Sequence, residues 1–266
     1  MVNKRITVVG ITGNQGGSVA DAFLNQPGWD VRGISRDKSS TASLDWVQKG
    51  VDMVQADLDD VESLKAAFSG STAIFGVTDF WQHVKNPSNL QKAHETGKTI
   101  NVVAYDIEVQ QGKNIVDAAQ ATSASLETLI LSVLSESKKY SEGRITWNYH
   151  FDGKWEFVKY LQTAYPELCA KTSLYQAGFF ISNLETAMAP KKLGQKIVFQ
   201  RSTVEAIDKI IPGGVGREIG EMLEYMSDPG YFGGEQAVRD LGLIKPEAIG
   251  VSGLTDVRKH LQELKV

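Results

Sequence analysis

The sequence predicts an α/β protein built on a doubly wound parallel sheet. Over the first half of the chain, short apolar runs alternate with longer segments of helical periodicity, as in repeated strand–helix–strand units. A glycine-rich turn follows the first apolar run and opens the first helical segment. The 266 residues, 42% hydrophobic and 23% charged, suffice for one large domain or for a domain with a smaller companion.

Five strands and four helices are expected in the first half of the chain. The strands are short and rich in β-branched residues, and we place them at Arg5–Val9, Asp30–Ser35, Val51–Gln55, Thr72–Val77 and Thr128–Val133. The helices carry apolar stripes at helical spacing, and we place them at Gln15–Asn25, Ser43–Lys49, Val61–Phe68 and Val102–Ala121. The polar stretch Asp79–Asn101 is expected to be irregular. Short crossovers between such strands give a parallel sheet with right-handed connections.

The second half has a different character. We expect a Ser-rich loop at Ser135–Arg144, a helix at Trp147–Tyr165, and strands at Thr172–Gln176 and Ile197–Gln200. From Ser202 onward helices dominate, with Ser202 as the N-cap and Glu205 completing a capping box. This change of character divides the chain into a sheet domain, 1–176, and a small, mostly helical region, 177–266.

The glycine-rich turn is the most informative motif. It reads Gly10-Ile11-Thr12-Gly13-Asn14-Gln15-Gly16-Gly17 and joins the first strand to the first helix. In a dinucleotide site the first glycine makes a tight turn, the second lets the backbone approach a pyrophosphate, and the third allows close helix packing. The helix N-terminus offers free N–H groups to the anion. The alternative is a plain strand-to-helix turn.

The end of the second strand indicates which dinucleotide fits. The sequence there is Ser35-Arg36-Asp37-Lys38. Arg36 can hold a ribose 2′-phosphate with a forked guanidinium, and Lys38 adds a second charge, which favours NADP(H). In the alternative, Asp37 accepts from a 2′-hydroxyl and the ligand is NAD.

Further candidates follow other strands. Asp57 either accepts from the adenine amino group, with Leu58 covering the ring, or caps the next helix. Val77 and Thr78 end the fourth strand at the edge where ligands bind in such sheets, and Phe80 either walls a pocket or belongs to the core. Gly178 and Phe179 follow the sixth strand, where they form an apolar floor beside the nicotinamide or ordinary core.

Three motifs together resemble the NmrA-like family of atypical short-chain dehydrogenase/reductase relatives. They are GITGNQGGS at Gly10–Ser18, VTDFW at Val77–Trp81 and HFDGK at His150–Lys154. The resemblance implies an NAD(P)-binding Rossmann-like domain with a smaller C-terminal substrate domain. It also implies NADP(H) in the cleft and either reductase activity or cofactor-sensing regulation of a partner protein. The cofactor contacts that it carries over are Thr12, Gly13, Asn14, Gln15, Gly16, Arg36, Thr78, Phe80 and Lys154.

The catalytic residues depart from those of short-chain dehydrogenases. Those enzymes use a Tyr-x-x-x-Lys pair on one helical face, whereas this chain has His150 and Lys154 at that spacing, with Tyr149 about 100° away around the helix. His150 either replaces the tyrosine as proton donor or only packs near the cofactor. Lys154 is expected to bind the ribose, the alternative being a solvated helix lysine. Ser132 stands where the family has its third polar residue, or is only a hydroxyl at the end of a strand.

The function predicted is that of an NADP(H)-dependent reductase acting on a small carbonyl, imine or enone. The alternative is a catalytically weak NADP(H) sensor that binds a transcription factor or another protein, favoured by an abrupt connection at Val198–Thr203 where family members have more of the substrate domain. A net charge of −4 argues against direct nucleic-acid binding.

Other classes of protein and site are disfavoured by the sequence. No pair of the four histidines has ligand spacing, and one cysteine cannot build a thiolate metal site, so no metal is expected. Without a leader or a run of about 18 apolar residues, we expect no membrane association and a soluble cytoplasmic protein, or a nuclear one if it regulates. Oligomerisation stays open.

Overall fold

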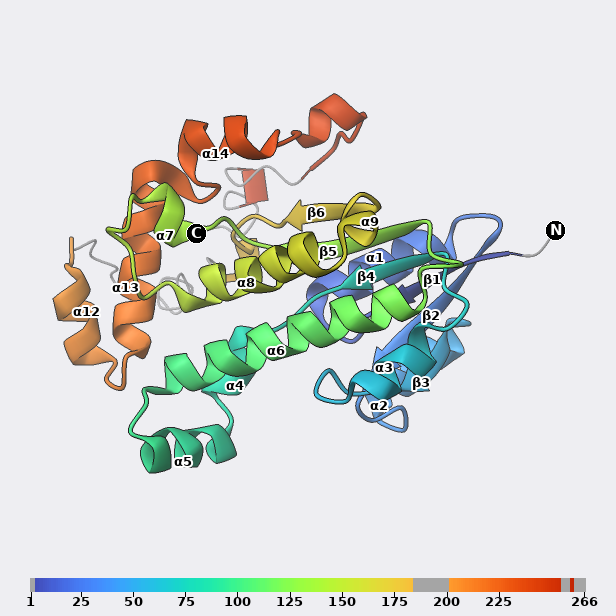
Figure 1. Cartoon of the computed structure of the whole chain (residues 1–266), viewed down its shortest axis with the longest axis horizontal. Coiled ribbons are helices and arrows are strands. Elements are labelled where there is room, and N and C mark those ends of the chain that lie inside the picture. The colour runs from blue at the N-terminus through green and yellow to red at the C-terminus, as the bar shows by residue number, and fades with distance from the viewer. Residues whose placement is uncertain (1–2, 184–200, 255–258, 261–266) are drawn as a thin grey trace.

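A six-stranded, fully parallel sheet forms the centre of the molecule (Figure 1). The computed structural model describes residues 3–183, 201–254 and 259–260. Its strand order is β3-β2-β1-β4-β5-β6, the order of a doubly wound dinucleotide-binding fold. The strands are β1 (Lys4–Val8), β2 (Trp29–Ser35), β3 (Asp52–Gln55), β4 (Ala73–Gly76), β5 (Thr128–Val133) and β6 (Thr172–Gln176).

Helices cover both faces of this sheet. On one face lie α1 (Asn14–Leu24) and α2 (Thr41–Gln48), packed over a core that includes Ile6, Val31 and Phe75. On the other lie α3 (Val61–Phe68), α6 (Ile100–Ala121) and α8 (Tyr149–Ala164), over a larger core of aliphatic and aromatic residues. Strands β2 to β5 contribute side chains to both cores, and with the parallel strand order the predicted fold class is confirmed.

The segment predicted to be irregular contains two helices. They are α4 (Phe80–Val84) and α5 (Pro87–Thr96). Asp79 caps α4 by accepting the Trp81 and Gln82 N–H groups, and the Asn86 side chain accepts the Ser88 N–H at the start of α5. The expectation for Asp79–Asn101 was therefore wrong, because capping residues rather than an apolar stripe start these helices.

Short helices join the remaining elements around β5 and β6. The loop predicted at Ser135–Arg144 holds a four-residue helix, α7 (Ser137–Tyr140), and α9 (Pro166–Cys169) follows α8. The predicted strand Ile197–Gln200 lies outside the described residues.

The C-terminal region is helical where it is described. It contains α12 (Val204–Ile210), α13 (Val215–Tyr225), a π-helical turn (Met226–Gly230), α14 (Gly234–Leu241) and a 3-10 turn (Pro246–Ile249). The cap of α12 is Thr203, which accepts the Ala206 N–H, rather than the predicted Ser202. A third core of Tyr140, Ile145, Phe151, Tyr225 and Ala237 joins these helices to α7 and α8.

Candidate functional site

The glycine turn lies at the carboxyl end of β1, where it leads into α1. Gly10 has a left-handed φ of 67°, and the Gly13 N–H donates to its carbonyl oxygen at 2.9 Å. A Cβ on Gly16 would lie 2.3 Å from that same oxygen, so α1 can start here only with glycine at this position. Gly13 caps α1 without a side chain. The N–H groups that begin α1, at Asn14 and Gln15, therefore face no capping side chain.

The turn is tied to the end of β5 by one side-chain bond. Ser132 Oγ donates to Gln15 Oε1 at 2.6 Å, across 117 residues of sequence. Both residues lie at the carboxyl edge of the sheet, so the predicted candidates come together there. In this structure the Ser132 hydroxyl hydrogen is used to hold Gln15.

The end of β2 presents two free cations and one engaged acid. Arg36 and Lys38 are exposed and form no hydrogen bond or ion pair with any residue that the structure describes. Asp37 Oδ1 accepts from the Ser39 hydroxyl at 2.5 Å and from the Ser39 N–H at 2.8 Å. These two bonds from Ser39 lower the pKa of Asp37. Asp37 thus serves its own turn, and Arg36 is the group available to a ligand.

The residues that follow β3 rule out one of the two roles predicted for Asp57, that of helix cap. The cap of α3 is Asp60, whose Oδ1 accepts the Glu62 and Ser63 N–H groups, so Asp57 is not the cap. Asp57 Oδ1 instead accepts the Asp59 N–H at 3.0 Å, which shapes the turn. Leu58 packs against the larger core and its carbonyl accepts from Asn114.

A buried ion pair lies beyond the end of β4. Lys154 Nζ donates to Glu108 Oε1 at 2.7 Å, to Thr78 Oγ1 at 2.8 Å and to the Thr78 carbonyl at 3.1 Å. Thr78 Oγ1 in turn donates to Glu108 Oε1 at 2.8 Å. The Glu108 side chain is fully buried and that of Lys154 is 10% exposed. All three ammonium hydrogens of Lys154 therefore have protein acceptors.

His150 forms a second buried pair one helical turn before Lys154. Its Nδ1 lies 2.6 Å from Glu218 Oε1, and its backbone N–H donates to the same oxygen at 3.0 Å. Its ring lies 5.0 Å from that of Trp81 and 5.7 Å from that of Phe80, between centroids. Tyr149 packs instead against Tyr105, and burial raises its pKa. His150, not Tyr149, shares the face of Lys154.

The apolar candidates differ in their burial. Phe80 is 2% exposed and belongs to the core beside His150. Val77 packs directly under the glycine turn, 2.9 Å from where a Cβ on Gly10 would lie. Phe179 is 38% exposed, so the alternative that it forms ordinary core is wrong. Gly178 stands 4.0 Å, measured from a built Cβ, from the ring of Phe232.

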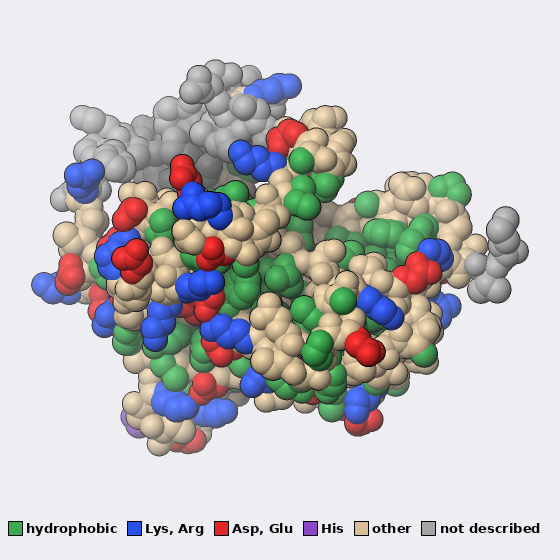
Figure 2. Space-filling view, turned by 45° about the horizontal axis from the view of Figure 1, so that its top comes forward, with side chains coloured by type: hydrophobic (Ala, Val, Ile, Leu, Met, Phe, Trp, Pro, Cys, Tyr) green, Lys and Arg blue, Asp and Glu red, His purple; other side chains and the backbone are tan. Residues whose placement is uncertain are grey.

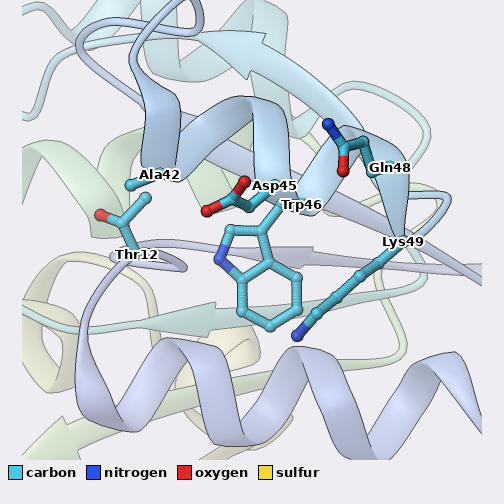
Figure 3. A pocket seen from close by; sticks show the side chains of 6 residues that line it. All are labelled: Thr12, Ala42, Asp45, Trp46, Gln48 and Lys49. Carbon is cyan, nitrogen blue, oxygen red and sulfur yellow. The ribbon is translucent and has the colours of Figure 1, made fainter.

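A hollow of about 510 Å³ opens between the glycine turn and α2 (Figure 3). Thr12 borders it on one side and Trp46 and Lys49 on the other, and the Lys49 ammonium is paired with Asp21. Neither His150 nor Lys154 lines this hollow, and α2 and α8 cover opposite faces of the sheet. It borders the glycine turn, not the polar residues predicted to do chemistry.

Two residues of the site escaped prediction. Glu108 sits mid-way along α6 and Glu218 on α13, both fully buried. An acidic residue in a predicted helix is usually solvated, so nothing local distinguished them. Within the ranges that the structure describes there is no cluster of potential metal ligands, and no helix is long and apolar enough to cross a membrane. Figure 2 shows lysines and arginines intermixed with acids on one face.

Sequence comparisons connect the chain with fungal oxidoreductases. The curated NmrA-like family domain-containing oxidoreductase cpsB of Aspergillus campestris is 33% identical over 141 residues, 53% of this chain and 37% of cpsB. The oxidoreductase lnbB of Aspergillus flavus is 30% identical over 188 residues, 70% of this chain and 51% of lnbB. The matched part thus spans about half or less of these relatives.

Structure comparisons agree on the fold. Quinone oxidoreductase QOR2 from Escherichia coli, solved with NADPH, superposes with a TM-score of 0.65 at 14% identity, covering 98% of this chain and 100% of QOR2. The negative transcriptional regulator NmrA, solved with NADP, superposes with a TM-score of 0.50 at 19% identity, covering 69% and 48%. The NmrA-like family pattern matches residues 2–192. With these motifs, this sheet order and that match, the chain belongs to the NmrA-like family.

Proposed function

We propose that this chain binds NADP(H) along the carboxyl edge of β1, β2 and β4 and reduces a small carbonyl, imine or enone. One arrangement carries the proposal: the uncapped start of α1 at the glycine turn stands beside the end of β2, where Arg36 has no partner in the described structure. The first feature suits a pyrophosphate and the second a 2′-phosphate. QOR2, solved with NADPH, supports this choice of cofactor.

The residues around β4 and α8 support the reductase. NADPH, when bound, supplies a hydride, and the substrate oxygen then needs a proton. His150 is placed to give that proton, because its imidazole lies on the Lys154 face of α8 and can act as a general acid. Lys154 keeps a positive charge at the end of β4 and would orient the ribose by exchanging a Thr78 bond for a ribose hydroxyl. Ser132, through Gln15, steadies the turn.

A second function, regulation without turnover, is favoured by the way these groups are already paired. Lys154 has three protein acceptors, and the Ser132 hydroxyl donates to Gln15, so neither is free in this structure. A site built only to bind cofactor would tolerate such pairing. NmrA, a negative transcriptional regulator, is solved with NADP.

Calorimetric titration with NADPH and NADH tests cofactor binding. Arg36→Ala should weaken NADPH binding about 10- to 100-fold, since a charge-assisted bond is worth roughly 1.5–3 kcal/mol. NADH binding should change little, because NADH lacks the 2′-phosphate. Arg239→Ala, on exposed α14, is the matched control, as Arg239 pairs only with its own helix. Equal binding of NADPH by all three proteins would refute the proposed 2′-phosphate contact.

A turnover screen on the same sample separates the two functions. The reductase predicts that NADPH absorbance falls with at least one carbonyl, imine, enone or quinone. Tight NADPH binding without any turnover would favour the regulator. In that case, cofactor-dependent capture of a partner protein, lost in Arg36→Ala, is the expected second result.

A further inference from the structure

The pairing of α13 with α8 brings a carboxylate onto the candidate proton donor. Glu218 comes from the C-terminal region, 68 residues beyond His150, and its side chain is fully buried. Oε1 accepts the His150 backbone N–H at 3.0 Å and lies 2.6 Å from the ring Nδ1, and Oε2 accepts from Asn101 Nδ2 at 3.0 Å. With N–H donors on both oxygens, the group is arranged as a carboxylate.

From this geometry we infer that Glu218 is a positioning residue that orients the His150 ring, so that Nε2 donates the proton to the substrate. The inference rests on the proposed reductase function. A carboxylate on Nδ1 fixes the hydrogen there and leaves Nε2 for chemistry, as it does where an acid orients a catalytic histidine. Nε2 makes no hydrogen bond within the described part of the chain.

Exposure agrees with this division of roles. The His150 side chain keeps 8% of its surface open and Glu218 keeps none. Of the two side chains, that of His150 keeps some surface that a substrate could contact and that of Glu218 keeps none. The Trp81 and Phe80 rings pack against the imidazole and hold it at the start of α4, next to Thr78 at the end of β4. The ring thus stands at the sheet edge where the nicotinamide is proposed to lie.

The proton and electron balance closes with these groups. The hydride from NADPH forms the new C–H bond at the substrate carbon, and NADP⁺ is released. The C=O or C=N π-electron pair moves to the oxygen or nitrogen, which takes the proton from His150 Nε2. His150 becomes neutral with Nδ1–H still bound to Glu218, and water returns the proton to Nε2.

Other charged groups near the pair do not replace Glu218. Lys154, one turn farther along α8, is paired with Glu108 at 2.7 Å. Asn101 on α6 is neutral, and Trp81 and Phe80 on α4 carry no charge. Glu221 lies on the same helix as Glu218, but it accepts the Thr146 and Trp147 N–H groups at 2.6 and 2.7 Å and pairs with Arg217. Glu221 therefore docks α13 on the chain entering α8 without touching the ring.

That contrast supplies the experiment. Glu218→Gln keeps the size of the side chain and removes its charge, and Glu221→Gln is the control on the same helix. We expect Glu218→Gln to lower kcat at least 10-fold with NADPH affinity and substrate KM within about 2-fold. Glu221→Gln should leave kcat unchanged. Equal effects of the two substitutions on kcat and KM would show that Glu218 only docks α13 and would overturn the inference.

A second measurement stands apart from turnover and needs no variant of Glu218. Nitrogen-15 NMR of the wild-type histidines, with His150 assigned through His150→Gln, should show the neutral ring protonated on Nδ1. A neutral ring protonated on Nε2 would refute the inference even if the enzyme is active. If the neutral ring is protonated on Nδ1 but the protein shows no turnover, the orienting role of Glu218 stands and the proposed reductase function is refuted.

Discussion

At the scale of single residues, the site is built from charges that were removed from water and paired. Lys154 and Glu108 are the clearest case, with three hydrogen bonds from the ammonium and almost no exposure. Breaking a buried pair costs far more than forming it gains, because one uncompensated charge stays behind. The pair therefore fixes the end of β4 against α6 and α8, whatever else it does for the cofactor.

Replacement of Lys154 by methionine tests this cost. Lys154→Met should destabilise the fold by roughly 3 kcal/mol, since it leaves Glu108 buried without its cation. Lys159→Met, on the same helix, should cost less than about 1 kcal/mol, because Lys159 is 48% exposed and its ion pairs are screened. Urea unfolding measures both. Equal losses of stability in the two variants would mean that the buried ion pair contributes no more than the exposed ones.

Asp152, inside the HFDGK motif, gives the fold a pH dependence. Burial raises its pKa to about 6, although the Lys138 N–H donates to it at 3.1 Å. The folded state therefore holds this proton between about pH 4 and pH 6, where the unfolded chain has lost it. Stability should fall as the pH rises through that window, by about 2 kcal/mol after allowance for partial exposure.

Asp152→Asn isolates this contribution. Asparagine can still accept from Lys138 but never ionises, so the variant should be more stable than the wild type at pH 8 and close to it at pH 4. Thermal unfolding across pH 4–8 measures the difference. A variant that loses stability equally at both pH values would contradict the assignment.

At the scale of elements, the sequence predicts the helices and strands that carry a repeating apolar pattern. It misses helices that are marked mainly by their capping residues. Three elements, at Val61–Phe68, Thr128–Val133 and Thr172–Gln176, have the predicted bounds, and strands β1 to β4 agree with their predicted bounds to within one residue at each end. The sequence does contain capping signals for α5, with Asn86-Pro87 at its start and the left-handed Gly97 at its end. They were overlooked because the helix is mostly polar and has no apolar stripe.

The glycine turn is the element on which the binding proposal depends. Gly16→Ala should cost at least 2 kcal/mol and weaken NADPH binding more than 10-fold, because its Cβ would lie 2.3 Å from the Gly10 carbonyl oxygen. Gly17→Ala is the matched control, since its Cβ would approach Ile11 O at 3.3 Å in ordinary helical backbone. Urea unfolding and calorimetry on both variants measure this. If the Gly16→Ala variant binds NADPH as tightly as the wild type, close packing of α1 on the turn at Gly16 is not required for binding.

At the scale of the whole molecule, the candidate site joins segments that no local pattern links. The glycine turn, Arg36, Thr78 and the His150–Lys154 face were predicted, because each lies within or directly after a recognisable motif. Glu108 and Glu218 were not, because their role exists only once α6 and α13 pack against α8. The site is thus complete only when the C-terminal helices are docked.

This docking should make the sheet and the C-terminal helices unfold together. Tyr225 is fully buried between them, with its hydroxyl 2.9 Å from Ser135 Oγ and its ring against Phe151. Tyr225→Ala should therefore cost about 3–5 kcal/mol. Circular dichroism and tryptophan fluorescence should still report one coincident urea transition, because Trp147 of the sheet domain stacks under Arg217 of α13 and so senses both parts.

Leu223→Ala on the same helix, at an exposed position, is the control and should cost less than about 1 kcal/mol. If Tyr225→Ala splits the unfolding into two transitions, α13 is a separate cooperative unit. Glu218 would then lose its contact with His150 whenever that unit opens. The His150–Glu218 pair would therefore form and break together with the docking of the C-terminal helices.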